Sequence, residues 1–412
     1  MSLHPGTQAA EILHMLRTRP RDHSLARAFY TDPALFQTDL EAVFHREWLF
    51  VAAECEVSSP GQYVAVDVGG SPILVVRDNE GTLRAFHNSC RHRGSKLVDA
   101  ACGTVKGLVC PYHRWTYRLD GSLTWAAYMP DDFDKSQHGL MPIHVRAIGG
   151  TVFVCMADDA PDIAPYADAM EPLLAPHGLR TGKLALEERI VVRGNWKLMM
   201  ENSRECYHCA AQHRPLMKYF LDIYDFKSPD DNAMIRTFWD RMEADGLPCQ
   251  IAEGPDHRAT RLPFTNGGVS TTPDGKPAVA RLLGTVPHND IGSLRWVHYP
   301  TVFNHALGDY AVLVRMLPLT PTTTEVCTKW IVDRDAIEGV DYDLARLREV
   351  WSVTNDEDAA LVERNQAGVN SIAYRPGPYS PELEAGVIKF VDWYCTRLAR
   401  HLGGTTRLTA VA

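Results

Sequence analysis

The chain has 412 residues, of which 45% are hydrophobic and 23% charged, the balance of an ordinary globular protein with room for two or three domains. Its formal net charge of −9 argues against a nucleic-acid or anionic-membrane surface, which would need a basic stripe. The N-terminal segment lacks the apolar core of a secretory signal, and no apolar run reaches the length of about 20 residues that a membrane span needs. We therefore expect a cytoplasmic protein with most of its ten cysteines as free thiols.

The first part of the chain changes texture near residue 47. Residues 1–46 predict helices and loops, because Phe36, Leu40 and Phe44 recur at helical spacing. Short strand-like runs separated by hairpin turns follow, at 63–68, 73–77, 83–87, 115–117, 123–125 and 150–156. We expect an N-terminal helical segment at 1–46 that packs with the catalytic domain, and a small antiparallel β domain over 47–157.

Two Cys/His pairs lie within this β domain. Cys90 and His92 follow one strand-like run, and Cys110 and His113 follow the next. A zinc site uses the same ligand types, but zinc fingers supply two cysteines first and then two histidines. One cysteine and one histidine from each loop instead suit a [2Fe–2S] cluster in which one iron has two thiolates and the other two imidazoles. The four residues are therefore predicted to hold such a cluster.

The segment 158–412 reads as a larger α+β domain, an antiparallel sheet flanked by helices. Strand signals lie at 186–192, 294–297, 311–317 and 325–332, and helical signals at 196–209, 342–364 and 381–402. Within the first helical signal, His208 and His213 stand five residues apart, about 140° from a shared helix face. They can converge only if the helix ends between them, for which Pro215 is a signal. Spacing alone leaves core or surface roles open.

These motifs resemble those of the Rieske non-haem iron oxygenases. The cluster residues lie in Cys90-Arg91-His92-Arg93-Gly94 and Cys110-Pro111-Tyr112-His113-Arg114-Trp115, and the run from Asn195-Trp196-Lys197 to His213 resembles the family's mononuclear iron motif. The resemblance implies that His208, His213 and Asp358 hold an Fe(II) ion as two imidazoles and one carboxylate, which leaves positions open for O2. Of the neighbouring acids, Asp356 and Glu357 are expected to stay in solvent.

The resemblance also implies a role for Glu205. In the family an acid at this position, usually aspartate, links a cluster histidine of a neighbouring subunit to an iron histidine. Glutamate is one methylene longer than aspartate, so the sequence alone does not give the geometry of this link. The same resemblance implies a homotrimer and a separate flavin/iron–sulfur reductase that brings electrons from NADH. The chain itself has no Gly-x-Gly-x-x-Gly motif after a strand for binding NADH.

Three segments resemble the branch of the family that acts on quaternary ammonium compounds, at 201–209, at 339–344, and at 374–380 with 390–394. This resemblance implies oxidative N-demethylation of proline betaine or glycine betaine, with release of formaldehyde. A permanent cation needs aromatic faces, and the aromatic-rich stretch 296–305 offers Tyr299, Phe303 and His305 as substrate-binding candidates, although an aromatic strand also suits a core. The alternatives are an aromatic-ring dioxygenase or aromatic demethylase, and a Rieske electron-transfer protein without oxygenase activity.

Overall fold

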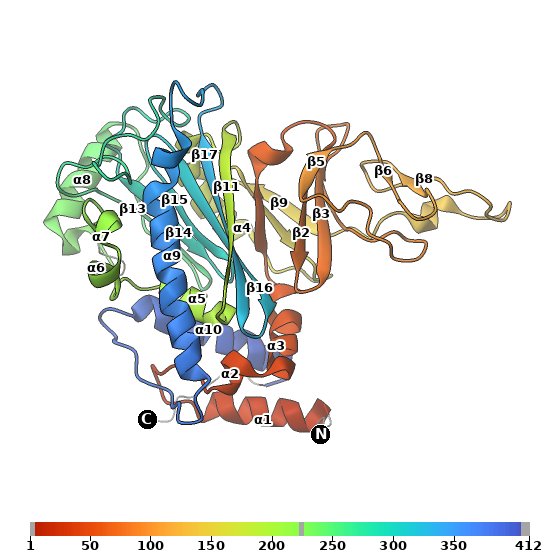
Figure 1. Ribbon diagram of the computed structural model, residues 1–412, viewed down its shortest axis with the longest axis horizontal. Helices are drawn as coiled ribbons and strands as arrows, with labels where there is room; N and C mark the ends of the chain where they lie inside the picture. Colours follow the sequence, from red (N-terminus) through yellow and green to blue (C-terminus); the bar gives the residue numbers. More distant parts are fainter. Residues whose placement is uncertain (1–4, 222–225, 405–412) are drawn as a thin grey trace.

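The computed structural model describes residues 5–221 and 226–404, and this part of the chain contains four antiparallel sheets (Figure 1). Helices lie around the large sheet and below it, whereas the small sheets extend to one side. Three small sheets form the first part of the molecule, and one large sheet dominates the second. The α+β class, with a small β domain beside a larger helix-flanked sheet, is confirmed.

The small sheets follow the predicted hairpins. The four-stranded sheet has the order β4-β3-β2-β5, with β2 (Gln62–Val68), β3 (Ser71–Arg77), β4 (Leu83–His87) and β5 (Cys102–Thr104). The outermost sheet consists of β6 (Leu108–Val109), β7 (Thr116–Tyr117) and β8 (Leu123–Trp125). The third joins β1 (Leu49–Ala53) to β10 (Thr151–Cys155) and β9 (His144–Ile148), and so brings both ends of the β domain together.

The large sheet has the order β11-β17-β16-β15-β14-β13-β12. Its strands are β11 (Lys183–Val192), β12 (Ala252–Glu253), β13 (His257–Leu262), β14 (Ser293–His298), β15 (Val302–Ala306), β16 (Ala311–Thr320) and β17 (Thr323–Val332). Successive side chains alternate between its two faces. Along β15, Val302 and Ala306 belong to the core beneath α4 (Ala164–Leu174), whereas His305 contacts Trp351 of α9 (Leu344–Val369).

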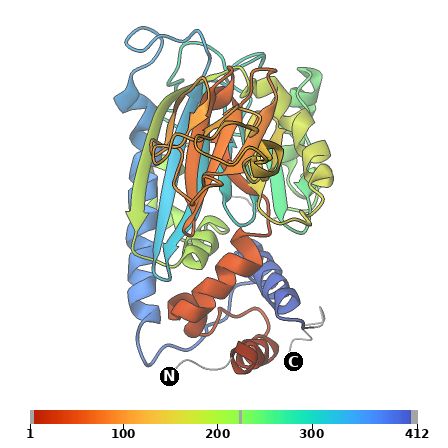
Figure 2. The same ribbon diagram turned by 90° about the vertical axis from the view of Figure 1, so that its right-hand side faces the viewer.

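Helices from both ends of the chain gather at one end of this sheet (Figures 1 and 2). They are α1 (Pro5–Arg17), α2 (Ala28–Thr31), α3 (Pro33–Asp39) with the π-helical turn Leu40–Phe44, and α10 (Ala385–His401). A buried ion pair joins α3 to α5 (Trp196–Ser203), because the Lys197 ammonium lies on the Asp39 carboxylate and both side chains are fully buried. The Tyr394 hydroxyl of α10 donates to the same carboxylate at 2.6 Å.

The predicted helix over 196–209 is wrong in its second half, since α5 ends at Ser203. The Glu205 carboxylate accepts the backbone N–H groups of Tyr207 and His208, which offers these groups a partner outside the helix ladder. Two short helices follow, α6 (Cys209–Gln212) and α7 (Arg214–Met217), before α8 (Ala233–Ala244).

A second carboxylate, Glu201 of α5, ties this region together. The Tyr30 hydroxyl of α2 donates to one carboxylate oxygen at 2.8 Å, and the Tyr379 hydroxyl donates to the other at 3.0 Å. Burial raises the pKa of Glu201 to about 7, although both tyrosines and Lys197 act to lower it.

This pKa predicts how stability changes with pH. The native state keeps a proton on Glu201 between pH 4.5 and 7 that the unfolded chain has released, so stability falls as pH rises through that window. Between pH 5 and pH 8 the wild type should lose on the order of 2 kcal/mol more than Glu201→Gln. Urea unfolding at both pH values measures the difference, with the exposed Glu382→Gln as control. Equal losses in wild type and Glu201→Gln would contradict the assignment.

Candidate metal centres

The two Cys/His loops meet at the outer end of the β domain. The thiols of Cys90 and Cys110 are buried, and the imidazoles of His92 and His113 are exposed with their Nδ1 atoms 3.1 Å apart. The structure therefore brings the four predicted cluster residues to one place, with thiols inside and imidazoles outside. This is the division that a cluster with one thiolate-bound and one imidazole-bound iron requires.

The two loops have equivalent backbones. The Cys90 N–H donates to the Ser95 carbonyl at 2.9 Å, and the Cys110 N–H donates to the Trp115 carbonyl at 2.8 Å. The fourth residue after each cysteine is left-handed, with φ of +76° at Gly94 and +64° at Arg114. Glycine reaches this region without strain, so the first loop follows from its sequence and the second does not.

Aromatic side chains cover the loops. Trp115 stacks on the His92 ring with centroids 4.9 Å apart, and Tyr112 stacks on His113 at 3.8 Å. The Tyr117 hydroxyl lies 3.2 Å from the Cys90 sulfur. Sequence reasoning missed Tyr117, since a tyrosine in a two-residue strand gives no signal of its own. Burial raises the pKa of the Cys90 thiol, so the cluster irons have to displace its proton.

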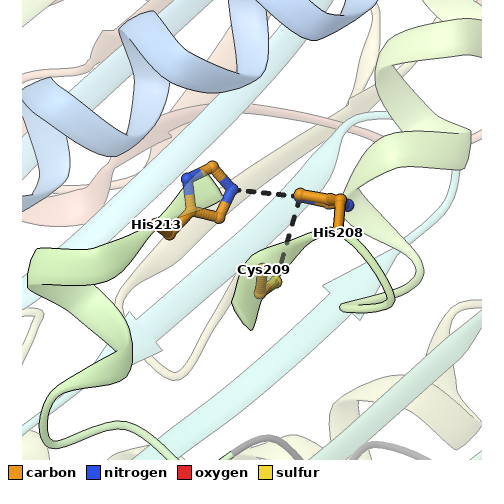
Figure 3. A group of neighbouring side chains, drawn as sticks. All are labelled: His208, Cys209 and His213. Carbon is orange, nitrogen blue, oxygen red and sulfur yellow. Dashed lines mark hydrogen bonds between the residues drawn. The ribbon is translucent and has the colours of Figure 1, made fainter. Parts of the chain in front are cut away.

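The second site forms where the chain breaks its helix. His208 precedes α6 and His213 follows it, and Figure 3 shows the two rings turned toward each other from the two ends of this helix. Their Nε2 atoms lie 3.0 Å apart. The Asp358 Oδ1 atom of α9 lies 3.3 Å from the first of these nitrogens and 3.0 Å from the second. Two imidazole nitrogens and one carboxylate oxygen thus converge on one point, as for the facial triad of a non-haem iron.

The opposite nitrogen of each ring also meets a carboxylate. His208 Nδ1 lies 2.6 Å from Glu205 Oε1, and His213 Nδ1 lies 2.8 Å from Glu357 Oε2. Burial alone would lower the pKa of His208, but Asp358 and Glu205 outweigh it and raise the pKa to about 9. The expectation that Glu357 stays in solvent is wrong: one residue along a helix turns the side chain by about 100°, which carries Glu357 to His213 and leaves Asp356 exposed.

Cys209 lies beside this site (Figure 3). Its sulfur is 3.9 Å from His208 Nε2, so by distance alone this sulfur would form a metal-binding group with the two histidines. That sulfur is bonded to Cys206 in a disulfide, so it has no thiolate to offer. Asp358, with its Oδ1 atom 3.3 Å and 3.0 Å from the two histidine nitrogens, is therefore the candidate for the third ligand. The other eight cysteines are free, as expected for most of them.

A hollow of about 240 Å³ opens beside the iron site. Its polar lining includes the carboxylates of Glu201, Glu205 and Glu384 together with His208 and Tyr379. Glu205 therefore has His208 on one side and an acidic, accessible hollow on the other.

The aromatic candidates separate in the structure. His305 contacts Phe303 at 4.9 Å and Trp351 at 4.5 Å between centroids, and Phe220 lies 5.6 Å from it. We call Phe220, Phe303, His305 and Trp351 the aromatic cluster. Tyr299 is not part of it, because this residue lies in the turn before β15 and packs on Phe390 and Trp393 of α10. Trp351 and Phe220 were not predicted, since both lie far in the sequence from the aromatic stretch 296–305.

Comparisons with known proteins identify two domains, and each contains one of the two candidate sites. The Rieske [2Fe–2S] domain matches residues 47–141, and the ring hydroxylating alpha subunit (catalytic domain) matches 179–400. Glycine betaine monooxygenase oxygenase subunits are similar at 48% identity in Chromohalobacter salexigens, over 94% of this chain and 88% of the relative, and at 44% in Pseudomonas aeruginosa, over 94% and 92%. A solved quaternary ammonium Rieske monooxygenase shares the fold with a TM-score of 0.71 at 23% identity, over 95% of this chain and 99% of that chain.

The match to the catalytic domain excludes an electron carrier that consists of a Rieske domain alone. No helix in residues 5–221 and 226–404 has the length and apolar character needed to cross a bilayer. The cofactors are a Rieske [2Fe–2S] cluster and a mononuclear iron, and O2 is the co-substrate. The chain belongs to the Rieske non-haem iron oxygenase family, as the alpha subunit of a monooxygenase.

Proposed function

We propose that this subunit oxidises an N-methyl group of a small betaine, with glycine betaine as the first candidate and proline betaine as the second. The identity of 48% with a glycine betaine monooxygenase oxygenase subunit, over nearly the whole chain, carries the proposal. One oxygen atom of O2 enters a methyl C–H bond and the other leaves as water, with two electrons and two protons consumed. The hydroxymethyl ammonium product then loses formaldehyde and a proton, which leaves a tertiary amine.

The aromatic cluster supports a cationic substrate. A quaternary ammonium group cannot lose its charge, and aromatic faces attract it. Burial and the nearby Arg295 guanidinium lower the pKa of His305 well below its usual value, so this ring is neutral. The Arg295 guanidinium lies over the Phe220 ring at 3.4 Å, so the aromatic faces offered to a cationic substrate are those of Phe303 and Trp351. Trp351 lies seven residues before Asp358 on α9, about 10 Å along the same face of the helix. In this proposal the aromatic cluster holds a methyl group near the iron.

The same proposal assigns the metal ligands. Cys90, His92, Cys110 and His113 hold the cluster, and His208, His213 and Asp358 hold the iron. The cluster supplies electrons one at a time and the iron activates O2. The side chains of this subunit hold both cofactors and bind the substrate in place. A separate flavin/iron–sulfur reductase delivers electrons from NADH.

We propose a homotrimer in which the cluster of one subunit serves the iron of the next. Figure 1 places β6 and β8, beside the cluster loops, at one end of the molecule and α6 and α7, beside the iron site, toward the other. Electron transfer within one chain would have to cross the whole large sheet. Exposed Arg91, Arg93 and Arg114 surround the cluster histidines, and the hollow beside Glu205 is acidic. Charges of opposite sign favour docking of the tip of one copy at the hollow of another.

The ligand assignment predicts the iron content. Wild-type protein should hold about three irons per chain, two in the cluster and one at the triad. Asp358→Ala should keep the reddish-brown cluster and lose the third iron, giving about two. Iron analysis together with the visible spectrum checks this. The assignment fails if Asp358→Ala retains about three irons.

Mixed oligomers test the transfer between subunits. His113→Ala lacks the cluster and Asp358→Ala lacks the iron, so each should be inactive alone. When both are co-expressed, about a quarter of the neighbouring pairs in a ring join a working cluster to a working iron, and activity should return to that level. Adding Glu205→Gln to the His113→Ala chain should abolish the recovery, whereas adding it to the Asp358→Ala chain should not. Recovery that ignores the location of Glu205→Gln would contradict the bridge.

A substrate panel tests the reaction. With NADH and the reductase of a glycine betaine monooxygenase system, formaldehyde should form from glycine betaine or proline betaine and not from a methoxybenzoate. Trp351→Leu should lower kcat/KM for the betaine by roughly 5- to 30-fold, as expected from 1–2 kcal/mol of cation–π attraction. Turnover of the aromatic acid alone would favour an aromatic demethylase, a second function within the same family.

A further inference from the structure

His213 is held from both sides of its ring by acids of one helix. Its Nδ1 atom lies 2.8 Å from Glu357 Oε2, and its Nε2 atom lies 3.0 Å from Asp358 Oδ1. The ring itself is almost completely buried, with 2% of its side-chain surface exposed, whereas 32% of the Glu357 side chain is exposed. Two consecutive residues of α9 thus grip opposite edges of the same imidazole.

This arrangement decides which nitrogen faces the metal point. A neutral imidazole has one N–H donor and one lone pair. Both ring nitrogens of His213 face a carboxylate, which can only accept. When a cation occupies the point between Nε2 and Asp358, it takes the place of a proton on Nε2, and Glu357 then holds the remaining proton on Nδ1 and leaves the lone pair on Nε2. That lone pair points to the place where Asp358 Oδ1 and His208 Nε2 also converge, 3.0 Å away in each case. Acceptors placed behind metal-binding histidines fix the ring and raise its basicity.

We propose that Glu357 is a positioning residue for the mononuclear iron, acting through His213. The inference rests on the ligand set proposed above. It gives the two carboxylates behind the histidines different tasks. Glu205 stands behind His208 and lines the open hollow, where the neighbouring cluster would dock. Glu357 stands behind His213 and is not one of the residues lining that hollow. Glu357 therefore orients His213 toward the iron, while Glu205 both orients His208 and connects the iron to the electron donor.

The test compares Glu357→Ala and Glu357→Gln with Asp356→Asn, in full-length protein whose cluster is loaded. Asp356 is the preceding acid of the same helix and is exposed, so its substitution removes a negative charge close to the site without touching His213. Fe(II) affinity is measured by competition with a chelator, and Co(II) is bound separately so that its visible d–d absorption reports the ligand geometry.

Glu357→Ala should weaken Fe(II) binding by about 10- to 100-fold and change the Co(II) spectrum, as for other partners of metal-binding histidines. Glu357→Gln should lose less, because its amide oxygen still accepts from Nδ1. Asp356→Asn should match wild type, and the cluster spectrum should be unchanged in all three. Wild-type affinity in Glu357→Ala would overturn the inference, as would an equal loss in Asp356→Asn, which would indicate a general charge effect.

The variant His213→Ala distinguishes a failure of the inferred Glu357 role from a failure of the proposed ligand set. If His213→Ala keeps the third iron, the proposed ligand set is wrong. If His213→Ala loses that iron while Glu357→Ala holds it as tightly as wild type, the ligand set stands and only the role of Glu357 is wrong. Should Glu357→Ala not fold, the comparison of Glu357→Gln with Asp356→Asn still decides, because both variants change one carboxylate to its amide.

Discussion

Two imidazole nitrogens and one carboxylate oxygen lie within 3.3 Å of one another at His208, His213 and Asp358, and the catalytic domain is organised around this meeting point. The three residues come from segments about 150 positions apart in the sequence. They meet because α5 ends early and because the long helix α9 crosses the face of the large sheet above the break. The carboxylates at both Nδ1 atoms then orient the rings, so a cation of the right size finds its ligands already aimed.

The distance between the two metal sites gives the second constraint. The cluster loops occupy a narrow β extension, with their imidazoles exposed, while the iron site lies beyond the large sheet. A single copy therefore carries a donor at one end and an acceptor at the other. The proposed head-to-tail association would use both ends, and the basic tip and acidic hollow have the opposite charges that favour it. In this account Glu205 is the residue where the electron path and the iron site touch.

The cluster site could be predicted from the sequence because each Cys/His pair lies in one short loop, and the hairpins around them follow from alternating residues and glycine turns. The iron site was harder to predict from the sequence. A five-residue spacing between His208 and His213 excludes a shared helix face, and the sequence did not show that α5 ends as early as Ser203. Glu357 and Asp358 are neighbours in a run of acids, so the sequence does not distinguish them. Which carboxylate contacts which nitrogen of His213 depends on the face of α9 that lies against this ring. Phe303 and His305 share one face of β15, as the alternation of side chains along a strand predicts. Tyr299 lies in the preceding turn, where this alternation does not apply.

We propose that a betaine binds beside an iron held by His208, His213 and Asp358. Electron paramagnetic resonance of the nitric oxide adduct of the Fe(II) protein tests it most directly, since the adduct reports both the iron and what lies next to it. If a betaine binds beside the iron, the high-spin iron–nitrosyl signal should change shape when glycine betaine is added and should be unchanged by a methoxybenzoate. The signal should also be absent from Asp358→Ala. A signal that does not respond to any betaine, or one that persists in Asp358→Ala, would contradict the account.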